Sequence, residues 1–137
     1  MQTIGQCFIT TKKDVDTLQF DWGIIHMLAH KGATGGSTFS FGVVELQQGK
    51  GHIRHNHPTA DEAIYVISGE AEQMLDDQEP VTIKQGDCIW IPKAIYHSTI
   101  NRSDKPVQLI VVYSPAGAEQ ALWDDPTVSI TPPDDKK

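Results

Sequence analysis

The chain has 137 residues, of which 39% are apolar, and a formal net charge of −7, which together allow one domain with one modest core. This charge, with only two arginines at Arg54 and Arg102, argues against nucleic acid or an anionic membrane as a partner. Residues 1–15 lack the apolar segment of a signal peptide, and Cys7 and Cys88 do not form a disulfide framework, so we expect a cytoplasmic protein.

Short runs of apolar and β-branched residues, separated by Gly, Pro, Asn and Asp, predict a series of strands. We expect these strands at about residues 19–28, 38–46, 52–57, 62–68, 70–75, 81–83, 88–91, 96–100 and 107–113. Residues 31–37 (KGATGGS) predict a flexible loop, and residues 116–123 predict a short C-terminal helix. The Pro- and Asp-rich residues 124–137 predict a loosely ordered tail. This pattern indicates one all-β domain, a sandwich or a barrel, over residues 1–137.

Four residues in two separate segments form a candidate metal site. His55 and His57 are two residues apart, and on a strand such residues project from the same face. Glu62 follows a short turn and begins the next predicted strand, which brings its carboxylate beside the two imidazoles. His97 lies in a different predicted hairpin and could complete the set from the facing sheet. Three imidazoles and one carboxylate suit Mn, Fe, Ni, Co, Cu or Zn as a divalent ion.

The same residues stand in two recognisable motifs. Residues 49–69 read G-KGHIR-H-N-H-PTAD-E-AIYVIS-G, and residues 86–101 read G-DCIWI-P-K-A-IY-H-STI-N. These segments resemble the two conserved motifs of the cupin superfamily, G-x5-H-x-H-x4-E-x6-G and G-x5-P-x-G-x2-H-x3-N. The first motif matches at every fixed position, whereas Ala94 replaces the second glycine of the second motif. That glycine serves a turn, so the replacement concerns the local backbone and not the metal ligands.

The resemblance covers about residues 38–113. Within the superfamily, the chain is most similar to small single-domain bacterial cupins. It implies a double-stranded β-helix, or jelly roll, with a metal ion inside the barrel bound by His55, His57, Glu62 and His97. Mn(II) or Fe(II) are favoured by this set of hard and borderline ligands, with Ni(II) or Zn(II) as alternatives. The resemblance also implies a homodimer.

Strand parity predicts which other side chains face the metal. If His55 and Glu62 point inward, then Ile53, Ile64 and Val66 should also point inward, with Arg54 and Asn56 outward. The same argument around His97 places Ile95, Thr99 and Asn101 inside. The predicted lining is mostly apolar, so a substrate would be held mainly by the ion and by shape.

The catalytic residues are not evident from the sequence. Pocket candidates are Tyr65, Gln73, Trp90 and His52, although core packing and cross-strand pairing explain the aromatic residues equally well. His26 and His30 could reach the mouth of the barrel, but lone histidines are more often surface residues. Cys88 is expected to be a small buried apolar residue, and Asp61 a solvated turn residue.

Two classes of function fit this pattern. The first is a metal-dependent enzyme acting on an oxygen-rich small molecule, either a dioxygenase or an isomerase, decarboxylase or lyase that uses the ion as a Lewis acid. The second is a non-catalytic metabolite-binding or sensor protein. The complete ligand set favours the enzyme, because a purely structural barrel does not need it. The fold alone does not decide between the reactions.

Overall fold

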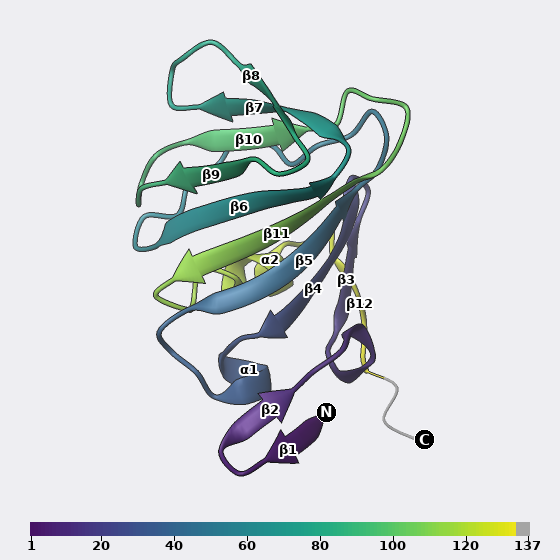
Figure 1. The fold of residues 1–137 in the computed structure, drawn as a ribbon, viewed down its shortest axis with the longest axis vertical. Coiled ribbons are helices and arrows are strands. Elements are labelled where there is room, and N and C mark those ends of the chain that lie inside the picture. Colours follow the sequence, from purple (N-terminus) through teal and green to yellow (C-terminus); the bar gives the residue numbers. More distant parts are fainter. Residues whose placement is uncertain (134–137) are drawn as a thin grey trace.

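The computed structural model describes residues 1–133, so residues 134–137 of the predicted tail lie outside the described residues. These residues form mainly β-strands with little helix (Figure 1). The strands are β1 (Gln2–Ile4), β2 (Cys7–Ile9), β3 (Thr17–Phe20), β4 (Gly23–Ala29), β5 (Ser40–Leu46), β6 (Asp61–Ser68), β7 (Glu70–Leu75), β8 (Val81–Lys84), β9 (Cys88–Ile91), β10 (His97–Ile100), β11 (Val107–Ser114) and β12 (Ser129–Thr131). The helices are the 3-10 turn η1 (Lys12–Asp14), α1 (Lys31–Thr34) and α2 (Gln120–Asp124). No helix among residues 1–133 has the length and apolarity to cross a bilayer.

Two sheets enclose the core. The larger has the strand order β12-β3-β4-β5-β11-β6-β9, and the smaller has the order β10-β7-β8, with antiparallel pairing throughout. Strand β11 pairs with both β5 and β6, so strands far apart in sequence meet at the centre of the larger sheet. The smaller sheet curves over one end of the larger (Figure 1), which is the double-stranded β-helix predicted from the sequence.

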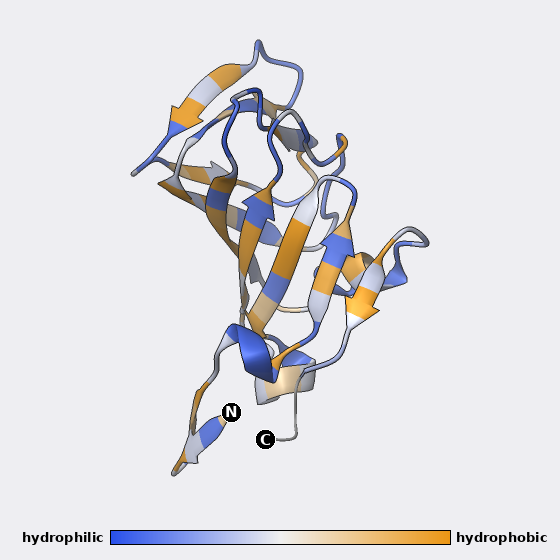
Figure 2. Cartoon of the chain, turned by 90° about the vertical axis from the view of Figure 1, so that its right-hand side faces the viewer, coloured by the Kyte–Doolittle hydropathy of each residue, from blue (hydrophilic) through white to orange (hydrophobic). Residues whose placement is uncertain are grey.

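Alternation of side chains along the strands builds the core. In β5 and β11, every second residue is buried, as expected for strands with one face against the core and one outward. The buried side chains are mostly aliphatic, such as Val44, Leu46, Leu109 and Val111, and each contributes about 1.5–3 kcal/mol by leaving water. Figure 2 shows the resulting apolar bands along the strands.

The structure corrects four sequence-based boundaries. The single strand expected at residues 19–28 is two strands, β3 and β4, joined by a turn. The expected flexible loop contains α1, a single helical turn. The His30 side chain caps its N-terminus, and Gly35, with φ +75°, ends it. The C-terminal helix is shorter and later than predicted. The tail expected to be loose includes β12, which pairs with β3 as an edge strand of the larger sheet.

Candidate metal centre

Four ligand-type side chains converge inside the barrel. His55 and His57 come from the connection between β5 and β6, Glu62 from β6 and His97 from the first position of β10. One donor atom from each lies within 4.8 Å of the others. His97 and Glu62 are almost fully buried, and His55 and His57 are half-buried. The structure thus brings together all four residues of the predicted ligand set, close enough for one ion to be bound by all of them.

The segment that carries His55 and His57 is not the regular strand predicted for residues 52–57. Two isolated bridges, Gly51 with Ile100 and His55 with His97, hold it against β10. Because the segment lacks a continuous ladder of hydrogen bonds, its side chains do not alternate between the two faces as in a regular strand. Ile53, which was predicted to point inward, is therefore 77% exposed. Where the strands pair regularly, the predicted alternation of inward and outward side chains is confirmed. The residues predicted to point inward there are buried: Ile64, Val66, Thr99 and Asn101.

Backbone carbonyls fix two of the imidazoles. Nδ1 of His55 lies 2.7 Å from the carbonyl oxygen of Ile53, and Nδ1 of His97 lies 2.9 Å from that of Ile95. A carbonyl can only accept, so in each ring Nδ1 carries the proton and donates. In the neutral form of each ring, Nε2 then keeps its lone pair and can bind a cation, as in metal-binding histidines whose other nitrogen is fixed by a hydrogen bond.

The carboxylate of Glu62 occupies the centre of the cluster. Its Oε1 lies 2.9 Å from Nε2 of His97 and 3.2 Å from Nε2 of His57. Despite these short distances, all three atoms are buried without a hydrogen-bond partner. Buried polar atoms without partners are destabilising, by about 1–3 kcal/mol each. A divalent cation among them would remove that cost, so the residues present fit such an ion.

The ionisation of the cluster also favours a cation. Burial raises the pKa of the Glu62 carboxyl, but the imidazoles of His57 and His97 outweigh this effect and hold it at about 2. Burial lowers the pKa of His55 to about 3. At neutral pH the site therefore presents a carboxylate and a neutral His55 imidazole, the forms in which both residues bind metal.

A tight turn holds the His57 segment in place. The Ala94 amide donates to the carbonyl of His57 at 2.9 Å, and the side-chain amide of Asn56 donates to the carbonyl of Ala94 at 3.1 Å. Ala94 has φ +70°, the left-handed conformation that glycine adopts more easily. The alanine that departs from the cupin motif therefore keeps the glycine backbone at a cost of about 1 kcal/mol.

A small and mostly apolar cavity of about 50 Å³ adjoins the ligands. Trp22, Tyr113 and Leu122 form part of its wall, with Leu122 contributed by α2. The rest of its wall includes Ile25, Val44, Leu46, His52, Ile64, Thr99, Leu109 and Val111. This agrees with the predicted apolar lining, and it leaves room beside an ion for only a small ligand.

The structure separates the pocket candidates. Tyr65 and Trp90 are exposed on the outer face of the larger sheet, so their assignment to the pocket is wrong, because they alternate with the buried Ile64, Ile89 and Ile91. Gln73 is fully buried behind the wall, where its Oε1 accepts a hydrogen bond from Thr99 at 2.6 Å.

His52 does line the cavity. Its ring centroid is 4.0 Å from that of His55 and 4.8 Å from that of Trp22. Burial lowers the pKa of His52 to about 4, so it is neutral at physiological pH.

The remaining residues considered in the sequence analysis lie outside the cavity. The His26 ring lies 2.9 Å from the hydroxyl of Thr17, and His30 caps α1 and packs 5.0 Å from Trp123, so neither reaches the cavity. Cys88 is exposed, not buried as predicted. Asp61 is the first residue of β6 and accepts a hydrogen bond from the Lys93 amide, so it is not a solvated turn residue.

Sequence reasoning did not identify Trp22, Tyr113 or Leu122 as cavity residues. Tyr113 pairs directly with Glu62 in the sheet, and its ring lies 4.8 Å from that of His57. Burial, followed by the charges of Glu62 and Glu119, raises its pKa well above the usual value, so the hydroxyl stays protonated. The alternation of β11 could have placed Tyr113 inside. Nothing in the sequence placed α2 over the cavity.

Comparisons with known proteins agree with this fold. The sequence profile described as "Cupin domain" matches residues 42–113. Protein SchB of Streptomyces halstedii is 34% identical over 83 residues, which are 60% of this chain and 59% of SchB. The chain therefore matches only about three fifths of the length of that relative.

Two solved structures have the same architecture. KdgF from a Halomonas species has a TM-score of 0.64 at 20% identity, covering 73% of this chain and 86% of that one. Oxalate decarboxylase from Bacillus subtilis has a TM-score of 0.65 at 21% identity, covering 72% of this chain and 27% of that one. At such low identity these likenesses establish the fold and not the activity.

Proposed function

The chain belongs to the cupin family, and from that premise we propose that it is a metal-dependent enzyme acting on a small oxygen-rich organic molecule. The observation that carries this proposal is the cluster of unpartnered Nε2 and Oε1 atoms of His57, His97 and Glu62, buried together beside a cavity. A purely structural barrel would fill this position with apolar side chains, because buried polar atoms without partners lower stability.

The residues of the chain define what the site does. His55, His57, Glu62 and His97 would hold the ion. When bound, it supplies Lewis-acid polarisation of a substrate oxygen or, if redox-active, a place to bring O₂ and substrate together. The apolar wall formed by Val111, Leu109 and their neighbours excludes water and strengthens electrostatic interactions inside. A substrate would then be selected by its oxygen atoms and by its small size.

The metal that we propose is Mn(II) or Fe(II), with Ni(II) or Zn(II) as alternatives. A site with one carboxylate and three imidazoles, and no thiolate, suits these ions. Mn(II) gains support from oxalate decarboxylase of Bacillus subtilis, a protein of the same fold whose Mn(II) centres have been characterised.

One observation favours a second candidate, a non-catalytic metabolite-binding protein. The only carboxylate among the described residues that line the cavity is Glu62 itself, and Glu62 would bind the ion. His52 is then the remaining ionisable imidazole beside the cavity. A site with so few proton carriers is better suited to oxygen chemistry or to binding than to general acid–base catalysis.

The test begins with the metal content of the purified protein, followed by reconstitution with Mn(II), Fe(II), Ni(II) or Zn(II). A panel of small mono- and dicarboxylic and hydroxy acids is then incubated with each form, with and without O₂. Glu62→Gln, which keeps the size of the side chain, should lose both metal and turnover. His30→Asn, outside the cavity and still able to cap α1, should lose neither.

The outcomes distinguish the candidates. Substrate loss coupled to O₂ consumption supports an oxygenase, and turnover without O₂ supports the Lewis-acid reaction. Tight binding of one acid without turnover supports the metabolite-binding protein and contradicts the enzyme. A protein that retains no divalent ion under any of these conditions contradicts the proposed function altogether.

A further inference from the structure

A row of buried polar side chains crosses the largely apolar inner face of the larger sheet. Ser40 of β5, Tyr113 of β11 and Glu62 of β6 are direct neighbours on adjacent strands. Each of the three residues is at most 5% exposed. Residues that pair directly across strands project from the same face of a sheet, so all three side chains point into the barrel. Tyr113 therefore stands between the metal-ligand candidate Glu62 and a second polar side chain.

The Ser40 end of this row is held by hydrogen bonds within the chain. The Ser40 hydroxyl donates to Oε1 of Glu119 at 2.8 Å, and the Gly117 amide donates to the same oxygen at 2.8 Å. Glu119 directly precedes α2 and is buried. A serine has one hydroxyl proton to donate, and here Glu119 accepts it. Ser40 is therefore not a hydrogen-bond donor to its neighbour Tyr113.

The Tyr113 hydroxyl has no such partner. None of residues 1–133 forms a hydrogen bond with it, although a buried tyrosine usually finds one. The unpartnered polar atoms that are completely enclosed are Nε2 of His57, Nε2 of His97 and Oε1 of Glu62, so the Tyr113 hydroxyl still borders open space. Tyr113 lines the metal cavity, which is that space. The hydroxyl is thus free to bind a molecule in the cavity.

The Tyr113 hydroxyl is a hydrogen-bond donor at neutral pH. A phenol is protonated there, and burial together with the charges of Glu62 and Glu119 raises the pKa of Tyr113 further. The other hydroxyl side chain among the described residues of the wall, Thr99, already donates to Gln73 at 2.6 Å. A molecule in the cavity that offers an acceptor oxygen can therefore take the hydrogen bond from Tyr113.

The charge of the cavity favours an anion. Glu62 is the one carboxylate among the described residues that line it, and none of them is a lysine or an arginine. A divalent ion bound by Glu62 and three neutral imidazoles leaves one positive charge unbalanced among mostly apolar side chains. An unbalanced buried charge is costly, so a ligand with a single negative charge is favoured over a neutral one. A carboxylate has that charge and a second oxygen for Tyr113.

The size of the cavity limits this ligand to a few atoms. Its volume is about 50 Å³, and one water molecule needs about 10–15 Å³ of such space. There is therefore room for about three or four non-hydrogen atoms. Carboxylates with one or two carbon atoms have that size.

We propose that Tyr113 is a specificity-determining residue of the metal centre, whose hydroxyl donates a hydrogen bond to one oxygen atom of a small monocarboxylate in the cavity. This inference rests on the proposed metal-dependent function, and it narrows the oxygen-rich molecule to a monoanion. The row from Ser40 to Glu62 fixes the place of the phenol ring, and the free hydroxyl recognises the ligand.

Binding of formate to the Co(II)-loaded protein tests the proposal, because the visible spectrum of Co(II) reports on its surroundings without turnover. Tyr113→Phe removes only the hydroxyl group. It should weaken formate binding by about 10- to 100-fold, the effect of losing one hydrogen bond to a charged group. Formamide, a neutral molecule of the same size, should bind the wild-type protein at least about 10-fold more weakly than formate does.

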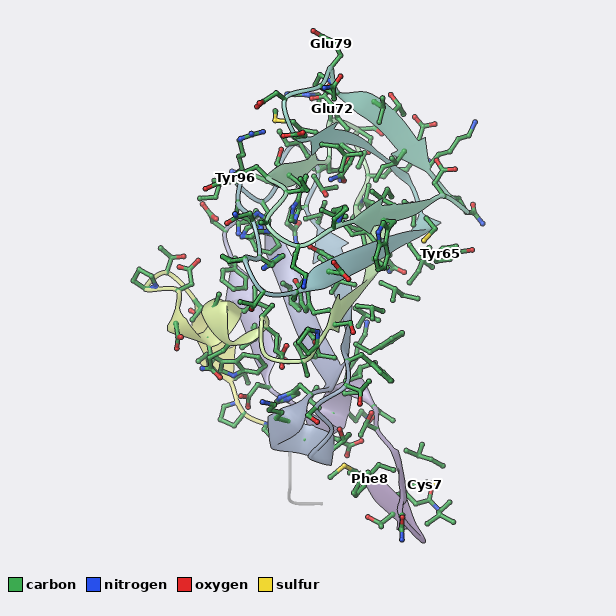
Figure 3. The ribbon with its side chains drawn as sticks, turned by 90° about the vertical axis from the view of Figure 1, so that its left-hand side faces the viewer. Cys7, Phe8, Tyr65, Glu72, Glu79 and Tyr96 are labelled. Carbon is green, nitrogen blue, oxygen red and sulfur yellow. The ribbon has the colours of Figure 1, made fainter. Side chains whose placement is uncertain are left out.

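The chain provides a matched control. Its two other tyrosines, Tyr65 and Tyr96, are exposed at the outside of the barrel (Figure 3). Tyr65→Phe makes the same chemical change on the outer face of the larger sheet, and it should bind formate as the wild-type protein does. Because the Tyr113 hydroxyl has no partner within residues 1–133, Tyr113→Phe should keep the wild-type metal content and melting temperature. A hydroxyl with a structural role would lower both.

The outcomes separate this inference from the proposed function. Equal formate affinity in Tyr113→Phe and the wild-type protein overturns the role of the hydroxyl, and so does a loss of metal or of thermal stability in that variant. Formamide binding as tight as formate binding overturns the selection of a monoanion. Retention of Co(II) without formate binding contradicts this inference alone. A wild-type protein that retains no Co(II) contradicts the proposed function and this inference with it.

Discussion

His55 and His97 exchange two backbone hydrogen bonds, from the His55 amide to the His97 carbonyl at 3.0 Å and from the His97 amide to the His55 carbonyl at 2.8 Å. The two residues come from different motifs and are 42 positions apart in the sequence. This single bridge joins the irregular segment before β6 to the regular strand β10. It sets the position of both imidazoles from the backbone, before any ion is bound.

Removing either of these two histidines should abolish metal retention. His55→Ala or His97→Ala takes away one ligand but keeps the backbone bridge, so the remaining ligands should bind on the order of 100-fold more weakly, or worse. Metal analysis after dialysis measures the effect, with His30→Asn as the control. Full metal occupancy in either alanine variant would show that the ligand assignment is wrong.

Metal removal should lower the thermal stability of the wild-type protein. A ligand that binds only the folded state contributes about 2.7 kcal/mol at a concentration 100 times its Kd, which corresponds to a shift of roughly 10 °C for a domain of this size. A calorimetric scan with and without a chelator measures this shift. The His97→Ala variant should show almost none, and an equal shift in that variant would contradict the site.

Ala94→Gly should stabilise the protein by about 0.5–1 kcal/mol. Ala94 has φ +70°, where the methyl group of alanine is strained and glycine is not. Denaturant unfolding of the metal-free protein measures the gain. Ala121→Gly is the matched control, because Ala121 is exposed in α2, where glycine should cost a similar amount. A loss of stability in Ala94→Gly would contradict the strain.

Asn101→Ala should destabilise the protein by about 2–4 kcal/mol. The buried side-chain amide donates to the carbonyls of Leu46 and Lys105, and its oxygen accepts from the amide and hydroxyl of Ser103. Truncation leaves these groups unpaired at the junction that leads into β11. Gln85→Ala, at an exposed position, should change stability by less than about 0.5 kcal/mol. A similar small effect at Asn101 would refute this role.

Leu122→Ala should open the metal cavity. Leu122 lies in α2 and forms part of the cavity wall, so its truncation should cost about 2–4 kcal/mol and give a chelator faster access to the ion. Stopped-flow metal removal measures that access. Ile89→Ala should cost a comparable amount, but Ile89 is a core residue away from the cavity, so the rate of metal removal should not rise. Equal rates in both variants would mean that α2 does not cover the site.

Regular elements were predictable because their pattern is local. The alternation in β5, β6 and β11 follows directly from the sequence, since one face of each strand is buried. Where the chain is not paired as a regular strand, the assumption of alternating side chains gave a wrong prediction, as for the exposed Ile53. Cys88, Tyr65 and Trp90 were misplaced for a related reason: an apolar residue on a half-buried strand can face outward, toward a surface that a single sequence does not reveal.

The sequence by itself determined an all-β domain and the four metal-ligand candidates, because both depend on a two-residue repeat and on spacings that short segments carry, and the resemblance to the two cupin motifs implied the jelly roll. Only the tertiary structure decided which residues form the cavity wall and which face of the larger sheet is exposed. Trp22 and Leu122 are 100 positions apart yet meet across the same cavity. Such contacts depend on how sheets and the C-terminal segment pack in space, and no local pattern specifies that packing.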